Sequence, residues 1–287
     1  MLISNQLSEQ QNRLFFKSHI PLKIKGEIEG EPVFRFVSFS DSHYGINDSS
    51  RGNDGLYQNR MQLIIDNIVA EREGKGLDFV LANGDIVHSS SADFPNSEAM
   101  MIEVINDYFS QLNLPIYSTA GNHDWINTDK WNDLFGHHRS HAFEHKDFGF
   151  IVADSSDLTG ARQICIDEGF VEDKVIEYAD KKGIFFVSHI PRFSGGFSTP
   201  DRDSPDCDRI NTALENADNV ILSTHGHFHH EDNKINRNVP AFFEGHISDY
   251  GVNYYGYRVY EVFEDRVKTY MWDMTNQRIV NEHTINF

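Results

Sequence analysis

Five short polar segments of the sequence carry the side chains that most often bind metal ions. They combine aspartate, asparagine and histidine without any cysteine: Asp41-Ser42-His43, Gly84-Asp85, Asn122-His123-Asp124, His189 and His227-Phe228-His229. Oxygen and imidazole donors without sulfur suit Mn, Fe, Zn or Co better than a structural zinc cage. The donor types therefore predict a site for a first-row transition metal.

The spacing within these segments also suits a shared site. Asp41 and His43 stand two residues apart, and so do His227 and His229. In an extended loop, residues two apart face the same side, so each pair can reach one metal position. Glycines at positions 84, 121 and 226 let the backbone turn tightly beside such a position.

Each polar segment follows an apolar run that predicts a β-strand. These runs are Val33–Ser40, Asp78–Ala82, Pro115–Thr119, Gly183–Ser188 and Val220–Thr224. Further strands are predicted at Phe148–Val152 and in a β-rich tail from Pro240 to Asp273, with Tyr257–Phe263 and Val267–Trp272. Apolar residues at helical spacing predict helices at Tyr57–Glu73, Asn96–Leu112 and Val171–Lys181.

The alternation of strands and helices predicts an α/β domain with one or two mostly buried sheets covered by helices. Ligands of such sheets bind at the carboxyl ends of the strands, where all five polar segments stand. Residues 1–32 are polar and mixed, and we expect them to form an N-terminal extension. Residues 33–287 show no repeat and no linker, which predicts one domain.

Composition narrows the class of protein. Apolar residues make up 39% of the 287 residues, enough for a sizeable core, and the formal net charge is −19. With no run of five Lys or Arg, the chain shows no broad surface for nucleic acid or an anionic membrane. No apolar stretch reaches 18 residues, and the N-terminus lacks the pattern of a secretory signal. Cys165 and Cys207 predict free thiols, so we expect a cytoplasmic protein.

The five segments, in this order, resemble the signature of the calcineurin-like metallophosphoesterase superfamily from Asp41 to His229. The resemblance implies a four-layer αββα fold, in which two mixed β-sheets pack as a sandwich flanked by helices. It assigns one metal to Asp41, His43, Asp85 and His229, and the second to Asp85, Asn122, His189 and His227. Asp85 would bridge the two metals, His123 would be a catalytic histidine that binds no metal, and Asp124 would orient His123.

The family chemistry is hydrolysis of a phosphate ester with two divalent ions, for which Mn is the expected choice in vitro. A metal-bound hydroxide would attack in line, because coordination lowers the pKa of water from about 15.7 to roughly 7. His123 would protonate the leaving group, a contribution of about 10²–10⁴-fold. The resemblance thus implies a small phosphodiester or phosphomonoester as substrate, and leaves the oligomeric state open.

The residues after the second motif separate the branches of the family. Protein Ser/Thr phosphatases carry Asp-Arg-Gly there, and purple acid phosphatases carry a tyrosine where this chain has His88. Two branches remain. Trp131–Asp154 resembles class III cyclic-nucleotide phosphodiesterases, which we favour. DNA repair nucleases tolerate histidine at position 88, but the acidic charge opposes that reading. A catalytically silent interaction scaffold is the third possibility, and the complete set of motif residues disfavours it.

Other polar residues near the motifs have weaker assignments. His88 and Arg192 are candidates for contact with substrate. His225 and His230 flank the last motif and are expected behind the ligands or at the surface. Surface positions are expected for His137, His138, His141 and His145. Ser194-Gly195-Gly196 could form a mobile lip over the site.

Overall fold

The computed structural model describes residues 30–45, 56–89, 94–156, 166–191, 205–229, 233–236, 238–247 and 255–287. Residues 32–287 form one compact unit. Its strands are β1 (Phe34–Ser40), β2 (Phe79–Asn83), β3 (Ile116–Thr119), β4 (His141–His145), β5 (Phe148–Val152), β6 (Gly183–Val187), β7 (Val220–His225), β8 (Asn233–Asn236), β9 (Val239–Phe243), β10 (Gly245–His246), β11 (Gly256–Val262), β12 (Arg266–Asp273) and β13 (Arg278–Asn286). Its helices are α2 (Leu56–Lys75), α3 (Phe94–Val104), α4 (Ser110–Leu112), α5 (Thr128–Phe135), α6 (Glu168–Glu177) and α7 (Pro205–Asn216), with a π-helical segment η2 (Ile105–Phe109) between α3 and α4.

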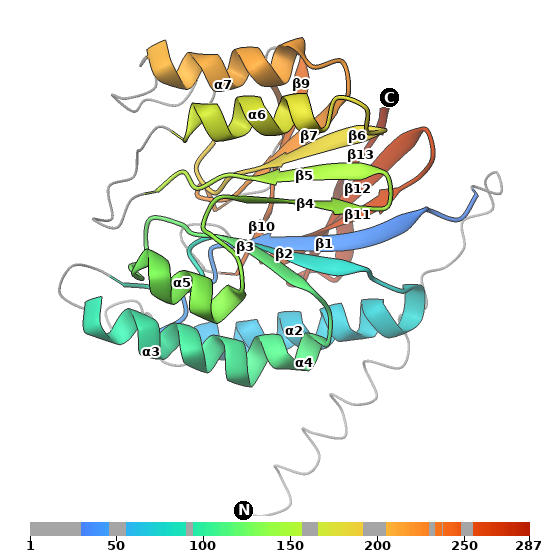
Figure 1. Cartoon of the computed structure of the whole chain (residues 1–287). Coiled ribbons are helices and arrows are strands. Elements are labelled where there is room, and N and C mark those ends of the chain that lie inside the picture. The colour runs from blue at the N-terminus through green and yellow to red at the C-terminus, as the bar shows by residue number, and fades with distance from the viewer. Residues whose placement is uncertain are drawn as a thin grey trace, which may run out of the picture. The chain divides into compact units, whose positions relative to one another are not determined.

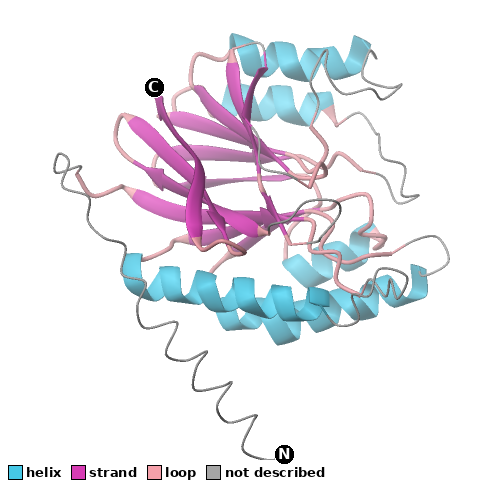
Figure 2. Ribbon diagram, turned by 180° about the vertical axis from the view of Figure 1, so that it is seen from behind, coloured by secondary structure: helices cyan, strands magenta, loops and turns pink. Residues whose placement is uncertain are grey.

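The strands form two mixed sheets. The first has the order β13-β12-β11-β1-β2-β3, with β10 paired to β1, and the second has the order β4-β5-β6-β7-β9-β8. Strands β1, β2 and β3 are mutually parallel, as are β5, β6, β7 and β9. In Figures 1 and 2, α6 and α7 cover one sheet, while α2, α3, α4 and α5 cover the other. This arrangement confirms the expected four-layer αββα sandwich.

Three apolar cores hold the four layers together. One lies between the two sheets and includes Phe36, Phe150 and Val187. The second joins the first sheet to its helices, through residues such as Val37 and Ile65, and the third joins the second sheet to α6 and α7. Phe36 and Val37 face different cores because neighbouring side chains of a strand point to opposite faces. Strand β1 therefore packs against apolar cores on both of its faces, which explains why it carries apolar residues on both.

The structure contains elements that sequence patterns did not predict. These are α5, α7, β4, β8 and β13, and the predicted helix Asn96–Leu112 is interrupted by η2. Helix α5 has clear terminal signals: the Asn127 side chain accepts a hydrogen bond from the Asp129 N–H at 2.8 Å, and Gly136 ends it with φ 73°. None of the helices in the part of the chain that the structure describes is both long and apolar enough to cross a membrane.

The chain passes from one sheet to the other at Glu244. Strand β9 ends at Phe243 in the second sheet, and β10 begins at Gly245 in the first sheet, where it pairs with β1. Strand β1 also lies between two longer partners. It is parallel to β2 on one side and antiparallel to β11 on the other. The carboxyl ends of β1 and β7 are thereby tied to the same short segment.

Candidate dinuclear metal centre

The five polar segments meet at the carboxyl ends of strands from both sheets. Asp41 and His43 follow β1, Asp85 follows β2, and His123 follows β3 in the first sheet, whereas His189 follows β6 in the second. His227 and His229 follow β7. Backbone hydrogen bonds connect these segments: the Asp41 N–H donates to the Gly84 carbonyl at 3.0 Å, and the Gly226 N–H donates to the His189 carbonyl at 3.0 Å.

One group of side chains could hold a metal ion between β1, β2 and β7. It consists of Asp41, His43, Asp85 and His229, which each offer one ligand atom, all within 4.8 Å of one another. The His229 Nε2 lies 3.1 Å from Asp41 Oδ1 and 3.1 Å from His43 Nε2. The His43 Nε2 lies 3.7 Å from Asp85 Oδ2. These are the four residues that the sequence resemblance assigns to the first metal.

A second group shares Asp85 with the first. It consists of Asp85, His189 and His227, again with ligand atoms within 4.8 Å of one another. The His189 Nε2 lies 3.3 Å from Asp85 Oδ2, while its Nδ1–H donates to the Asn83 carbonyl at 2.8 Å. That hydrogen bond leaves Nε2 free to face Asp85. Asn122, the fourth expected ligand, is buried.

Buried atoms of this cluster provide a test of whether metals fit. Asp41 Oδ1, Asn122 Oδ1 and His189 Nε2 are all buried, and none has a hydrogen-bond partner among the described residues. The nearest polar atoms to two of them, His229 Nε2 and Asp85 Oδ2, belong to residues that are themselves expected ligands. Buried polar atoms normally have partners. Oxygen and imidazole donor atoms that converge from several loops, three of them buried without hydrogen-bond partners, are what a pair of metal ions requires, so the residues fit the two ions.

Electrostatics of the cluster favour positive charge. Burial acts to raise the pKa of Asp85, but His189 and His43 hold that pKa well below its usual value. Burial likewise acts to raise the pKa of Asp41, yet His229 and His189 lower it. Burial acts to lower the pKa of His189, but Asp85 and Asp41 raise it to about 10. Two buried carboxylates that remain anionic mark a position suited to divalent cations.

The backbone at the expected ligands is in the left-handed region. The φ angles are 55° at Asp41, 44° at His43, 49° at Asp85, 73° at His227 and 55° at His229. Such a conformation is unfavourable for residues other than glycine, by about 1–2 kcal/mol each. Strain of this kind collects at functional sites, where surrounding structure holds it in place.

Two glycines allow the segments to approach one another. Gly84 has φ 81°, and a Cβ atom there would lie 2.5 Å from His189 Nδ1. A Cβ at Gly121 would lie 2.2 Å from the Asp85 backbone nitrogen. A side chain at either position would push apart the segments that bear Asp85, His189 and Asn122.

His123 lies beside the shared carboxylate but belongs to neither of the two groups above. Its backbone N–H donates to Asp85 Oδ1 at 2.7 Å, and its ring Nδ1 lies 3.2 Å from the Ser89 carbonyl. A carbonyl can only accept, so Nδ1 carries a proton and Nε2 is the atom left for chemistry. The Asp124 carboxylate instead accepts from the Gly121 and Val87 N–H groups, each at 2.9 Å. Ser89, rather than Asp124, contacts the ring in this structure.

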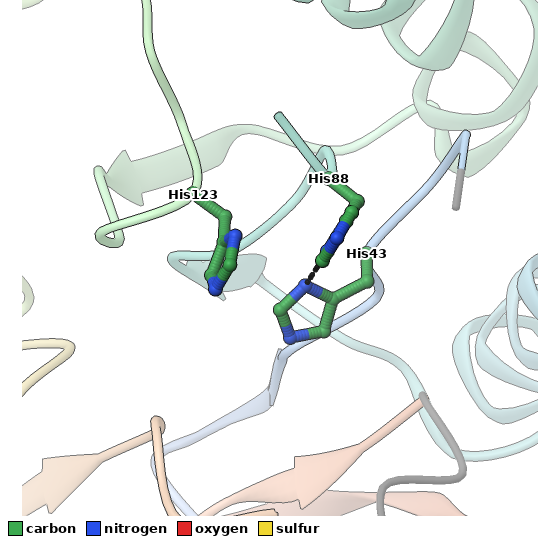
Figure 3. Close-up of side chains that lie close together, drawn as sticks. All are labelled: His43, His88 and His123. Atoms are coloured by element: carbon green, nitrogen blue, oxygen red, sulfur yellow. Dashed lines mark hydrogen bonds between the residues drawn. The ribbon is translucent and has the colours of Figure 1, made fainter. Parts of the chain in front are cut away.

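His88 joins the site next to His43 and His123. Its Nδ1 lies 3.0 Å from His43 Nδ1, and its ring stacks on His123 with centroids 4.6 Å apart and planes 18° apart. Figure 3 shows the three imidazoles grouped together, each from a different loop. Their ring nitrogens could themselves hold a metal ion, being within 4.8 Å of one another. Arg192, His230 and Ser194-Gly195-Gly196 lie outside the described residues.

Several polar residues differ from their sequence-based expectation or were missed. His225, expected behind the ligands or at the surface, is fully buried at the end of β7, and its ring nitrogens lie 3.0 Å from the Ser188 and Ser223 hydroxyls. His145 pairs with Asp78 at 3.0 Å. His137 and His141 are partly buried and stack on each other with centroids 3.7 Å apart; of the four expected at the surface, only His138 is exposed. The contact of Ser89 with the His123 ring could not be predicted from sequence, because it is made by the Ser89 backbone carbonyl, which every residue type has.

The sequence matches a family model, and the fold is similar to those of solved structures. The family model of the calcineurin-like phosphoesterases matches residues 34–268. A dimetal phosphatase from Danio rerio is similar in structure, with a TM-score of 0.67 and 14% identity over 90% of this chain and 100% of that chain. GAP50, the anchor in the inner membrane complex of Plasmodium, has a TM-score of 0.62 and 14% identity over 88% of this chain and 89% of that chain. The family match spans most of the sequence and includes all five segments of the cluster, so the chain belongs to the calcineurin-like phosphoesterases.

Proposed function

We propose that this protein is a dinuclear-metal phosphoesterase that hydrolyses a small phosphodiester or phosphomonoester. Asp41, His43, Asp85 and His229 would hold one divalent ion, and Asp85, Asn122, His189 and His227 the second. The observation that carries the proposal is that the two groups of donors meet in one shared carboxylate, Asp85. When bound, the ions supply the activation of water and the neutralisation of phosphoryl charge.

His123 is the proposed general acid. Its Nδ1–H is held by the Ser89 carbonyl, so Nε2 is the ring nitrogen that would deliver a proton to the leaving group. The backbone hydrogen bond to Asp85 fixes the ring beside the shared carboxylate without using a ring nitrogen. An alkoxide is a poor leaving group, and a positioned proton donor speeds its departure by about 10²–10⁴-fold.

Asp124 and His88 are proposed to support His123. Asp124 is buried, and its two backbone hydrogen bonds fix the turn that carries Asn122 and His123. Burial and the charge of Asp85 raise the pKa of Asp124 to about 7. His88 stacks on the His123 ring and would form one wall for the substrate. Arg192 remains a candidate for phosphate contact on sequence grounds alone.

A small substrate is favoured by charge. The formal net charge of −19 opposes a long polyanion, which would need cationic contacts along its backbone. We therefore favour small diesters or monoesters, including cyclic nucleotides, over the single-stranded DNA that a repair-type nuclease would cleave.

A substrate panel with metal analysis tests the proposed function. The purified protein, loaded with Mn²⁺, is assayed with p-nitrophenyl phosphate, bis-p-nitrophenyl phosphate, cyclic nucleotides, nucleotide anhydrides and single-stranded DNA. We expect two metal ions per chain and metal-dependent turnover of at least one small ester. Preferred cleavage of DNA would support the nuclease alternative. No turnover by a folded, metal-loaded sample would favour an interaction scaffold.

Chelation should lower the stability of the protein as well as its activity. An ion present at 1,000 times its dissociation constant stabilises the folded state by about 4 kcal/mol. For a domain of this size, we expect EDTA to lower Tm by roughly 8 °C or more, with recovery when Mn²⁺ is restored. Thermal unfolding with and without EDTA, followed by re-addition of Mn²⁺ or Mg²⁺, measures the effect. An unchanged Tm would count against buried metals.

A further inference from the structure

Glu244 lies behind the candidate metal centre, where the chain crosses between the two sheets. Its side chain is fully buried, with a relative exposure of 1%. Its backbone N–H donates to the His225 carbonyl at 2.8 Å, which ties it to the end of β7. A carboxyl group in such a position must find hydrogen-bond partners to offset the loss of water.

One oxygen of the Glu244 carboxyl joins strands from both sheets. Glu244 Oε1 accepts hydrogen bonds from the Ser38 hydroxyl on β1 and from the Thr224 hydroxyl on β7, the latter at 2.9 Å. The Thr224 hydroxyl also lies 2.7 Å from the Tyr260 hydroxyl on β11. Ser38 precedes Asp41 by three residues, and Thr224 precedes His227 by three, so this network lies beneath two ligand-bearing loops.

Asn83 connects this network to His189. The Asn83 side-chain amide donates to the Ser188 carbonyl at 3.5 Å and to the Thr224 carbonyl at 3.3 Å. Its backbone carbonyl accepts the Nδ1–H of His189 at 2.8 Å, and so orients the His189 ring toward Asp85. The Asn83 side chain also lies within hydrogen-bonding reach of Glu244.

Two buried oxygens in this network lack partners. They are Glu244 Oε2 and Asn83 Oδ1, neither of which has a hydrogen-bond partner among the residues that the structure describes. Two acceptors cannot bond to each other, and each would cost about 1–3 kcal/mol if left unsatisfied. A single proton on Glu244 Oε2 would turn that oxygen into a donor and satisfy both atoms at once.

We propose that Glu244 is a positioning residue that acts as a neutral carboxylic acid, accepting from Ser38 and Thr224 and donating to Asn83. Through Asn83 it fixes the ring of His189, and through Thr224 it fixes the end of β7 that leads to His227. The proposal rests on the proposed metal centre, because His189 and His227 are two of its ligands.

In the metal-free protein, the surroundings of Glu244 favour the neutral form. Burial raises the pKa of Glu244 to about 7, even though the hydrogen bonds from Ser38 and Thr224 oppose the increase. The negative charge of Asp41 at the end of β1 acts in the same direction as burial. The other titratable groups around the network are Tyr260 and Arg258 on β11 and His225 on β7, and Arg258 donates to the Phe243 carbonyl.

Glutamine should replace Glu244 without loss, and this is the central test. The carbonyl of Glu244→Gln can accept from Ser38 and Thr224, while its NH₂ group can donate to Asn83, as the protonated acid does. We expect E244Q to bind two metal ions with wild-type affinity. Glu244→Ala leaves the network incomplete, and loss of such outer partners typically weakens metal binding by about 10–100-fold. Metal content and metal titration by calorimetry measure both variants.

The pH dependence of stability gives a second readout. A carboxyl whose pKa is raised on folding stabilises the folded state least at high pH, because the unfolded chain releases the proton first. In metal-free protein, the wild type should lose stability relative to E244Q as pH rises from about 4.5 to about 7. At pH 8, E244Q should unfold roughly 5 °C higher than the wild type.

A matched control and three outcomes separate this proposal from its alternatives. Glu261→Gln makes the same chemical change on β11, where Glu261 pairs with Arg35 near the surface, and it should leave metal binding unchanged. If E244Q weakens metal binding as E244A does, a charged carboxylate is needed and the proposal fails. If E244A keeps full affinity, Glu244 does not position the ligands. If the wild type binds no metal, the proposed function fails. The pH comparison in metal-free protein would still test whether Glu244 is protonated in the folded state.

Discussion

Replacement of Asp85 by asparagine should empty or cripple both metal sites and lower turnover by at least about 10³-fold. Asp85 is common to the two groups of metal-binding side chains, and its Oδ2 lies 3.3 Å from His189 Nε2 and 3.7 Å from His43 Nε2. An amide cannot offer two anionic oxygens to two cations. Asparagine tolerates left-handed backbone conformations, so the φ of 49° at this position should survive the substitution.

Metal analysis and steady-state kinetics on Asp85→Asn measure this effect. Asp78→Asn is a matched control, because Asp78 precedes the same strand β2 at its opposite end and pairs with His145. The control should keep two metals and full activity. A D85N protein that retained two ions at wild-type affinity would show that the two sites do not share this carboxylate.

The second large effect is expected at His123. Substitution of His123 by alanine should lower turnover by about 10²–10⁴-fold while two metal ions remain bound. The ring contacts the Ser89 carbonyl and the rings of His43 and His88, and it is not needed to complete either of the two Asp85-containing groups. The backbone N–H that donates to Asp85 is retained in the variant, so the shared carboxylate keeps its position.

Leaving-group dependence distinguishes a proton donor from a residue that merely shapes the site. p-Nitrophenolate leaves readily without a proton, whereas an alkoxide does not, so H123A should impair alkyl phosphate esters far more than p-nitrophenyl esters. His138→Ala is a suitable control, because His138 is exposed on the segment after α5. Equal loss with both kinds of ester, or parallel loss of metal, would contradict the general-acid assignment.

Strands in which a short apolar run is followed by a polar loop could be predicted from sequence. Strands β1, β2, β3, β6 and β7 are buried runs that end in polar loops, and this pattern located every strand that carries a proposed ligand. Parallel strands place their carboxyl ends along one edge, so convergence of the loops followed from topology. The expected ligands came from the resemblance of the five segments to the family signature, and the structure brings Asp41, His43, Asp85 and His229 close together, and Asp85, His189 and His227 likewise.

Long-range pairing and backbone contacts could not be predicted in this way. Strand β4 contains two histidines and a glutamate, and it is a strand because it pairs with β5 across a short turn. Strand β13 alternates exposed and partly buried residues at the edge of its sheet. Glu244 is a single acid at the end of an apolar strand, and its role depends on partners up to 206 residues away. No local pattern contains that information.

The position of β1 in its sheet has a consequence for how the protein forms during translation. Phe34 pairs with Val262 and Ser38 with Arg258, so one neighbour of β1 is made more than 200 residues after it. Contacts this distant in sequence slow folding because a long loop must close first. A growing chain on the ribosome would expose the apolar β1 until β11 emerges. We therefore expect nascent chains that end before β11 to depend on chaperones and to capture metal poorly.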